Sequence, residues 1–207
     1  MFEPDVTITD LCIVVECVYF SCLFYKHRFN HELYFWFFVY FASIASTAFF
    51  GALYHGAGFN NALTMSAYWI WNCVLLSGGV SGLSFWMLGK SLCVAHARVT
   101  KVEKMVMVIA CLIVALTQAD SFFLATIACL PGLGSFIYEL IRLKTDGYLW
   151  CVSALLVMIF ASFLQYAQVS LHELYFTYNA VCHVVLIISY AMLFYGGKKI
   201  ASSFAKK

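Results

Sequence analysis

Charged residues are scarce in this chain of 207 residues, where Asp, Glu, Lys and Arg together make up only 11%. Hydrophobic residues make up 64%, and the mean hydropathy is +0.89. A soluble globule of ordinary composition cannot bury so much apolar surface. The scarcity of charge therefore argues against a soluble enzyme and predicts a membrane protein.

Other features are also missing from the sequence. The nine cysteines form no CxxC pair and lie almost all in apolar runs, where cysteine behaves as a small hydrophobe. The basic residues form no patch with interleaved aromatic residues, so nucleic-acid binding is not expected. The chain opens with the acidic stretch MFEPD, so we expect no cleavable signal peptide.

Seven apolar windows lie almost end to end along the chain, each of a length that crosses about 30 Å of hydrocarbon as a helix. They predict an all-α fold, an integral membrane bundle of seven transmembrane helices. Because only short polar breaks separate the windows, the bundle is predicted to form a single domain over residues 1–207. The predicted spans are 7–26, 33–55, 63–88, 103–118, 121–143, 148–168 and 174–197.

The orientation of the bundle follows from its basic residues, which are retained on the cytoplasmic side of membrane spans. All 12 Lys and Arg residues fall in the first, third and fifth connections or in the C-terminal tail. With seven spans they lie on one face, whereas an added or missing span would scatter them over both. We therefore predict that the N-terminus lies outside and the C-terminus in the cytoplasm. The protein is predicted to lie in the plasma membrane or an endomembrane.

A few polar residues lie inside the predicted spans, where ionisable groups are costly and usually face the bundle interior. At about 1.5 Å per residue, Glu16 and His183 lie about 15 Å below the outer surface, Asn179 about 9 Å and His55 about 6 Å. His172, Asn179 and His183 are separated by 7 and 4 residues and share one helical stripe. Four of these residues, Glu16, His55, Asn179 and His183, are the candidate site.

The chemistry of these residues leaves several roles open. His55 and His183 are candidate zinc ligands, but a catalytic zinc normally has three protein ligands and a water. Glu16 is a candidate third ligand or general base, Asp120 is an alternative base, and Asn179 is a candidate for orienting a substrate carbonyl or water. Asp10, Asp120 or His172 could also contribute to the site from the rim. Structurally, His55 could instead mark the membrane interface, and His183 and Asn179 could hydrogen-bond neighbouring helices.

Three short stretches carry a resemblance to a known family. They are the acidic TITD ending at Asp10, expected near the outer rim, FFGALYH ending at His55, and YNAVCH ending at His183. With seven spans and an outside N-terminus, the chain resembles the alkaline ceramidase and adiponectin-receptor-like (CREST) superfamily of membrane hydrolases. The resemblance implies a zinc below the membrane surface, held by three histidines, whose bound water attacks a lipid amide.

The chain departs from this family at three positions of the implied site. His55 and His183 match two of the zinc-binding histidines, but Asn179 stands where the family has the third. Gly51 stands where the family has a serine, and the predicted span 63–88 contains no acidic residue where the family has an aspartate. A site with two histidines would need a replacement ligand and another way to hold the water.

Two functions are consistent with these observations. The first is a zinc-dependent membrane hydrolase that acts on a lipid amide or ester. The second is a non-catalytic lipid-binding or membrane-scaffold protein with the same bundle and no metal. A third function, proton or small-solute transport along Glu16, Asn72, Asn179 and His183, is less favoured because no half of the chain is repeated.

Overall fold

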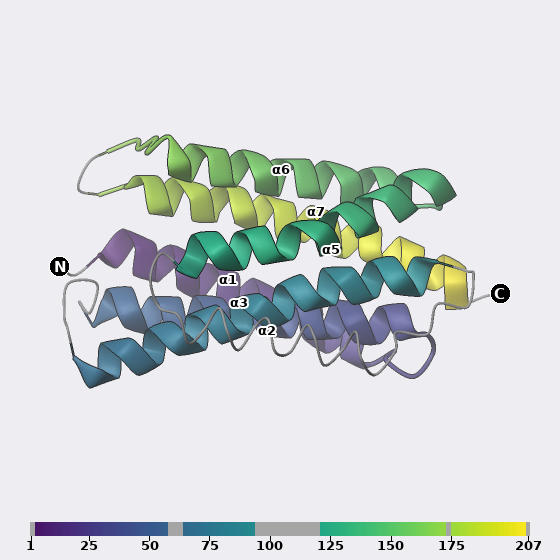
Figure 1. The fold of residues 1–207 in the computed structure, drawn as a ribbon, viewed down its shortest axis with the longest axis horizontal. Coiled ribbons are helices and arrows are strands. Elements are labelled where there is room, and N and C mark those ends of the chain that lie inside the picture. Colours follow the sequence, from purple (N-terminus) through teal and green to yellow (C-terminus); the bar gives the residue numbers. More distant parts are fainter. Residues whose placement is uncertain (1–2, 58–63, 94–120, 173–174, 206–207) are drawn as a thin grey trace.

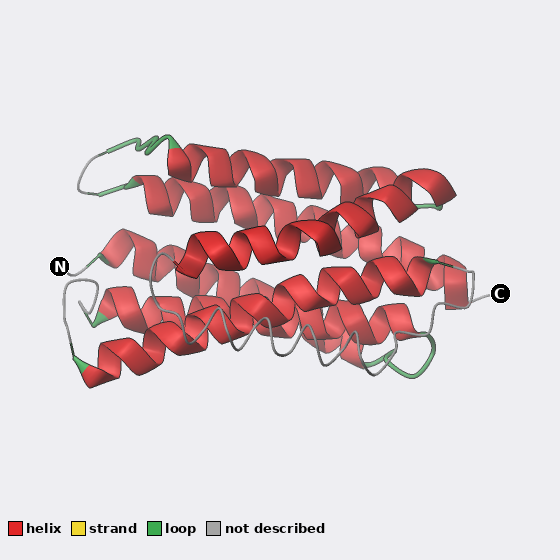
Figure 2. Cartoon of the chain, in the orientation of Figure 1, coloured by secondary structure: helices red, strands yellow, loops and turns green. Residues whose placement is uncertain are grey.

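The computed structural model describes residues 3–57, 64–93, 121–172 and 175–205. Within these residues the regular structure is helical, apart from an isolated bridge between His172 and Phe176 (Figure 2). The prediction of an all-α fold is confirmed. The helices are α1 (Pro4–Tyr25), α2 (Glu32–Gly56), α3 (Met65–Leu92), α5 (Ser121–Leu143), α6 (Tyr148–Tyr166) and α7 (Tyr178–Ala205).

Five of these helices, α1, α2, α3, α6 and α7, are long and apolar enough to cross a membrane. Each overlaps one of the predicted spans, and α5 coincides with the predicted span 121–143. The predicted span 103–118 lies outside the described residues. The chain is therefore a helical protein whose described helices suit a membrane.

The helices pack lengthwise as one bundle (Figure 1). Neighbours along the chain run in opposite directions in the pairs α1 and α2, α2 and α3, and α6 and α7, while α3 and α5 run in the same direction. The parallel pair packs closely, because a Cβ at Gly132 would lie 3.1 Å from the backbone oxygen of Gly82. Gly82 is the last residue of the stretch SGGVSG in α3, whose small side chains permit such close helix packing.

Local sequence explains where several helices begin. Pro4 occupies the first turn of α1, where a missing N–H costs nothing. The Thr64 hydroxyl accepts a hydrogen bond from the backbone N–H of Ala67 and caps α3. The His31 ring accepts from the N–H of Leu33 at the start of α2, and burial lowers the pKa of this imidazole, which favours the neutral ring that can accept.

The two halves of the bundle are filled differently. Along the buried face of α2, large side chains (Phe37, Tyr40, Phe41) give way to alanines at 45, 48 and 52. Aromatic rings from α1 and α7 pack beside the large side chains, with the Phe20 and Phe194 rings stacked at 4.2 Å between centroids. The small residues in the second half of α2 cannot fill the same space. This change in size leaves room for a cavity.

The two ends of the bundle differ in charge. At one end, here called the basic end, α1, α3, α5 and α7 finish, and Lys199 pairs with Asp146 in the connection between α5 and α6. The Tyr34 hydroxyl at the start of α2 lies 3.1 Å from Ser202 Oγ near the end of α7. The described Lys and Arg residues all lie at this end, namely Lys26, Arg28, Lys90, Arg142, Lys144, Lys198 and Lys199.

Candidate functional site

A cavity of about 430 Å³ lies at the opposite end of the bundle, where the small residues of α2 face α1, α3, α6 and α7. It is here called the His55 cavity. Its lining combines aliphatic walls with hydroxyl, amide, imidazole and carboxyl groups. The lining residues are Asp10, Ile13, Ile44, Thr47, Ala48, Gly51, Tyr54, His55, Trp71, Val74, Gln165, Tyr178, Asn179 and Tyr190.

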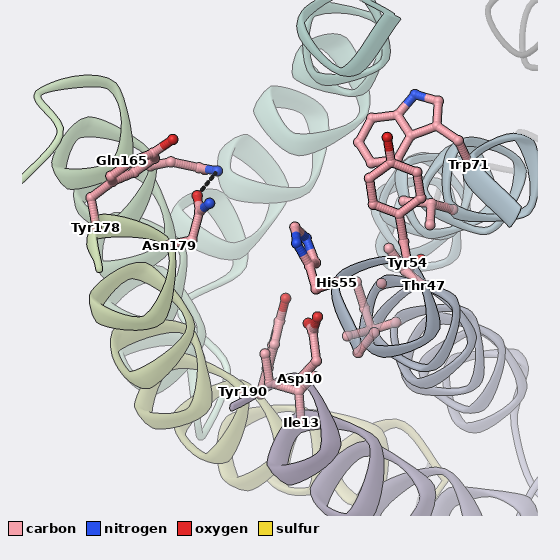
Figure 3. Close-up of a pocket in the computed structure, with 14 residues that line it drawn as sticks. Asp10, Ile13, Thr47, Tyr54, His55, Trp71, Gln165, Tyr178, Asn179 and Tyr190 are labelled. Atoms are coloured by element: carbon pink, nitrogen blue, oxygen red, sulfur yellow. Dashed lines mark hydrogen bonds between the residues drawn. The ribbon is translucent and has the colours of Figure 1, made fainter. Parts of the chain in front are cut away.

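His55 lies in the last turn of α2 and projects into this cavity (Figure 3). Its Nδ1 lies 2.7 Å from Glu3 Oε2. The backbone N–H of Glu3 also points at the carbonyl oxygen of His55, with 3.5 Å between N and O. The start of α1 is therefore joined to the end of α2, and Glu3 holds one side of the His55 ring.

Asp10 is the acidic group of the His55 cavity. Its side chain is almost fully enclosed, with 5% of the residue exposed. A Cβ at Gly51 would lie only 2.9 Å from Asp10 Oδ2, so the glycine in α2 is what leaves room for the carboxyl group. Among the described residues, Oδ2 has no hydrogen-bond partner.

His183 lies on α7 directly behind Asp10. Its Nδ1 is 3.5 Å from Asp10 Oδ1 and 3.0 Å from the hydroxyl oxygen of Thr9. Because this nitrogen faces two oxygens of α1, the ring fastens α7 to α1. His183 therefore meets the candidate site through Asp10 instead of lining the cavity itself.

Asn179 lies on the far wall of the cavity, formed by α6 and α7. Its side-chain oxygen accepts a hydrogen bond of 3.1 Å from the amide nitrogen of Gln165 (Figure 3). The oxygen of the Gln165 amide in turn accepts a weak hydrogen bond from Cys182 Sγ at 3.8 Å. The amide of Asn179 is thus held in place by α6 and presents its remaining hydrogen-bonding capacity towards the cavity.

Glu16 lies away from the other candidate residues. It lines a shallow groove on the outer side of α1, together with Ile8, Leu11, Cys12 and Val15. Among the described residues its Oε2 has no hydrogen-bond partner. The structure therefore brings His55 and Asn179 to one cavity, places His183 next to it, and leaves Glu16 on another face of the bundle. Asp120 lies outside the described residues.

The described residues do not fit the zinc site that the resemblance to CREST hydrolases implies. Within residues 3–57, 64–93, 121–172 and 175–205, no group of three His, Cys, Asp or Glu side chains could hold a metal ion. The Nδ1 atoms of His55 and His183 face Glu3 and α1, respectively. Their arrangement resembles a set of helix-joining contacts more than a ligand set.

Some residues of the cavity have no part in the sequence-based candidate site. Asp10 was expected to contribute only from the rim, and Trp71 was not among the candidate residues, yet both line the cavity. Gln165 and Tyr190 belong to no motif that would have marked them as candidates. The change from aromatic residues to alanines along α2 is the sequence feature that could have indicated the cavity, since it marks where the core is underfilled. It does not identify which residues on other helices face the gap.

Comparison with known proteins identifies a family for the chain but indicates no activity. Residues 6–202 match the sequence profile of a family of unknown function, DUF6962. No curated protein and no solved structure matches the chain. The matched range covers nearly all of the chain and includes every residue that lines the His55 cavity.

Proposed function

The chain belongs to the DUF6962 family of unknown function, and we propose that it is a multi-pass membrane protein that binds a lipid in the His55 cavity. The observation that carries this proposal is the cavity of about 430 Å³, with polar groups at fixed positions inside a bundle of apolar helices. This volume lies within the range of small-molecule sites in proteins, about 300–1,000 Å³.

The lining of the cavity suits an amphipathic ligand. The carboxyl group of Asp10 and the paired amides of Gln165 and Asn179 offer hydrogen bonds to a polar head. Ile13, Ile44 and Val74 provide an apolar wall for the beginning of an acyl chain. A buried carboxyl oxygen without a partner is costly, so a ligand that donates a hydrogen bond to Asp10 would lower the free energy of the bound state.

We further propose seven spans, with the N-terminus outside and the C-terminus in the cytoplasm. Because α3 and α5 run in the same direction, a further crossing between them accounts for the connectivity, and the predicted span 103–118 supplies it. The clustering of the described Lys and Arg residues at one end of the bundle supports the proposed orientation. The His55 cavity would then open towards the outer leaflet.

The arrangement of side chains favours lipid binding over zinc-dependent hydrolysis. Glu16, the candidate general base, lines a groove outside the cavity, and the described residues assemble no set of three metal ligands. Asp10 of α1 supplies an acidic group beside Gly51 and His183, where the CREST resemblance would take one from the third helix. Among the described residues, the site therefore offers polar recognition without a set of three metal ligands.

Mass spectrometry of lipids that copurify with the full-length protein tests this proposal. Ala48→Phe should fill the cavity and remove most of the retained lipid, because Ala48 lines the cavity and is buried. Ser46→Phe is the matched control, since Ser46 lies two residues away on the exposed side of α2. Equal lipid retention by both variants, or zinc that copurifies with the wild type and is lost in His55→Ala, would contradict metal-free lipid binding.

A further inference from the structure

A second pocket lies at the basic end of the bundle, far from the His55 cavity along α7. It has a volume of about 350 Å³ and is here called the Lys198 pocket. Two adjacent lysines, Lys198 and Lys199, line it together with Tyr195, Ser202 and Asp146. The proposed function makes no use of these residues.

The lysines of the Lys198 pocket are held differently. Lys199 Nζ lies 3.6 Å from Asp146 Oδ1 and 5.0 Å from the centre of the Tyr195 ring. One carboxylate and one aromatic face thus position this ammonium group at the wall of the pocket. Lys198 is exposed, and no acidic side chain among the described residues forms an ion pair with it. The pocket therefore carries a net positive charge despite Asp146.

The small residues one turn further along α7 give the pocket its space. Ser202 Oγ donates to the carbonyl oxygen of Lys198 at 2.7 Å, and Ser203 Oγ donates to that of Lys199 at 3.0 Å. Both hydroxyl groups are thereby folded back onto the helix and leave the region beside the lysines open. Phe194 supplies an apolar wall on the side that faces the bundle.

We propose that the Lys198 pocket binds the phosphate group of an anionic phospholipid. The pocket combines ammonium groups with an apolar wall at the end of the bundle where the described basic residues gather. Lys and Arg residues next to a membrane surface attract anionic lipids. A phosphate ester with an acyl chain matches both parts of this pocket, whereas free phosphate matches only the lysines.

The test is a titration of the purified full-length protein with short-chain phosphatidylglycerol, phosphatidylcholine or inorganic phosphate, followed by native mass spectrometry. Lys198→Gln combined with Lys199→Gln should weaken phosphatidylglycerol binding by about thirtyfold, since each lysine near anionic lipid contributes about 1 kcal/mol. Lys26→Gln combined with Lys144→Gln is the matched control. It removes the same charge at the same end without changing the pocket lining, and it should change binding by less than about twofold.

Asp146→Asn is a further variant, which should change phosphatidylglycerol binding in the opposite direction. Removing the carboxylate that pairs with Lys199 should strengthen phosphatidylglycerol binding by a few fold. Equal binding of phosphatidylglycerol and phosphatidylcholine, or equal losses in the two double variants, would overturn the proposal. Binding of inorganic phosphate without phosphatidylglycerol would overturn the assignment to a lipid.

The two lipid sites can be tested separately. Ala48→Phe, which fills the His55 cavity, should leave phosphatidylglycerol binding at the Lys198 pocket unchanged. The lysine variants should leave the lipid of the His55 cavity in place. Failure of one proposal therefore does not imply failure of the other.

Discussion

The two faces of α1 carry acidic side chains with different neighbours. Asp10 is 5% exposed, lies against Gly51 of α2 and has Oδ1 at 3.5 Å from His183 of α7. Glu16, six residues further along, lies among Ile8, Leu11 and Val15 on the outer side of the helix. Six residues advance an α-helix by about 1.7 turns, so the two carboxyl groups leave the helix on different sides.

This difference shows that the position of an acidic residue along α1 does not determine its role. The predicted depth of Glu16 indicates how much an unpaired carboxylate would cost. It does not indicate on which side of the helix a partner lies. Asp10 occupies the inner face because Gly51 leaves space for it, and that space exists only where α1 and α2 meet.

The largest expected effect comes from closing the space that Asp10 occupies. Gly51→Ala places a Cβ 2.9 Å from Asp10 Oδ2 and should lower the free energy of unfolding by up to about 3 kcal/mol, the usual cost of overpacking. Gly78→Ala is the matched control, because a Cβ there meets nothing within 4 Å. Thermal denaturation of the purified variants measures both.

A double variant tests whether the Gly51→Ala effect acts through the carboxyl group. Asp10→Ala should restore most of the stability that Gly51→Ala removes, since it withdraws the atoms that the new Cβ meets. A Gly51→Ala protein as stable as Gly78→Ala would show that Asp10 does not fill this space.

A smaller loss is expected from the first inward carboxylate of α1. Asp5 Oδ2 accepts hydrogen bonds from the backbone N–H of Thr177 at 2.9 Å and from its hydroxyl group at 2.7 Å. Asp5→Asn should lower the free energy of unfolding by about 1.5 kcal/mol, because hydrogen bonds to charged groups are stronger than neutral ones. Glu16→Gln makes the same carboxylate-to-amide change on the outer face and should have no comparable effect on thermal stability.

The comparison between the two faces extends to ligand binding. Asp10→Asn should reduce the lipid that copurifies with the protein by about fivefold, which corresponds to the loss of roughly one hydrogen bond. Glu16→Gln should leave that amount unchanged, because Glu16 lies outside the cavity lining. If Glu16→Gln removes the lipid and Asp10→Asn does not, the proposed site is on the wrong face of α1.

The smallest effect is expected at the mouth of the cavity. Glu3 and His55 form a contact of 2.7 Å whose side chains are 29% and 19% exposed. Glu3→Gln should lower the free energy of unfolding by less than about 1 kcal/mol, because partly exposed ion pairs contribute little. Thermal denaturation at low and high salt checks this, and a loss as large as that of Gly51→Ala would contradict the assignment of Glu3 to a peripheral contact.

Much of the architecture was predictable from local patterns. Apolar runs of sufficient length predict helices at the positions of α1, α2, α3, α5, α6 and α7, and these helices are present. The stripe of Asn179 and His183 places both residues on α7 near the cavity. Helix periodicity could achieve this because it depends only on spacing along one element.

The composition of the candidate site was less predictable. Gln165 reaches Asn179 from α6, and Asp10 reaches the cavity from α1, but neither pairing follows from spacing within one helix. The sequence also does not indicate which face of α1 is buried, since the inner and outer faces are both apolar apart from their acidic residues. An amphipathic pattern normally reveals the buried face of a helix, and α1 lacks that signal because both of its faces are largely apolar.

The sequence by itself determined that this chain forms apolar helices with basic residues gathered at alternate connections, because length, hydropathy and charge act locally. Only the tertiary structure decided which acidic group faces the interior, which histidine lines the cavity and which one joins α7 to α1. Those outcomes depend on the rotation of each helix about its own axis, and that rotation is set by the side chains of its neighbours.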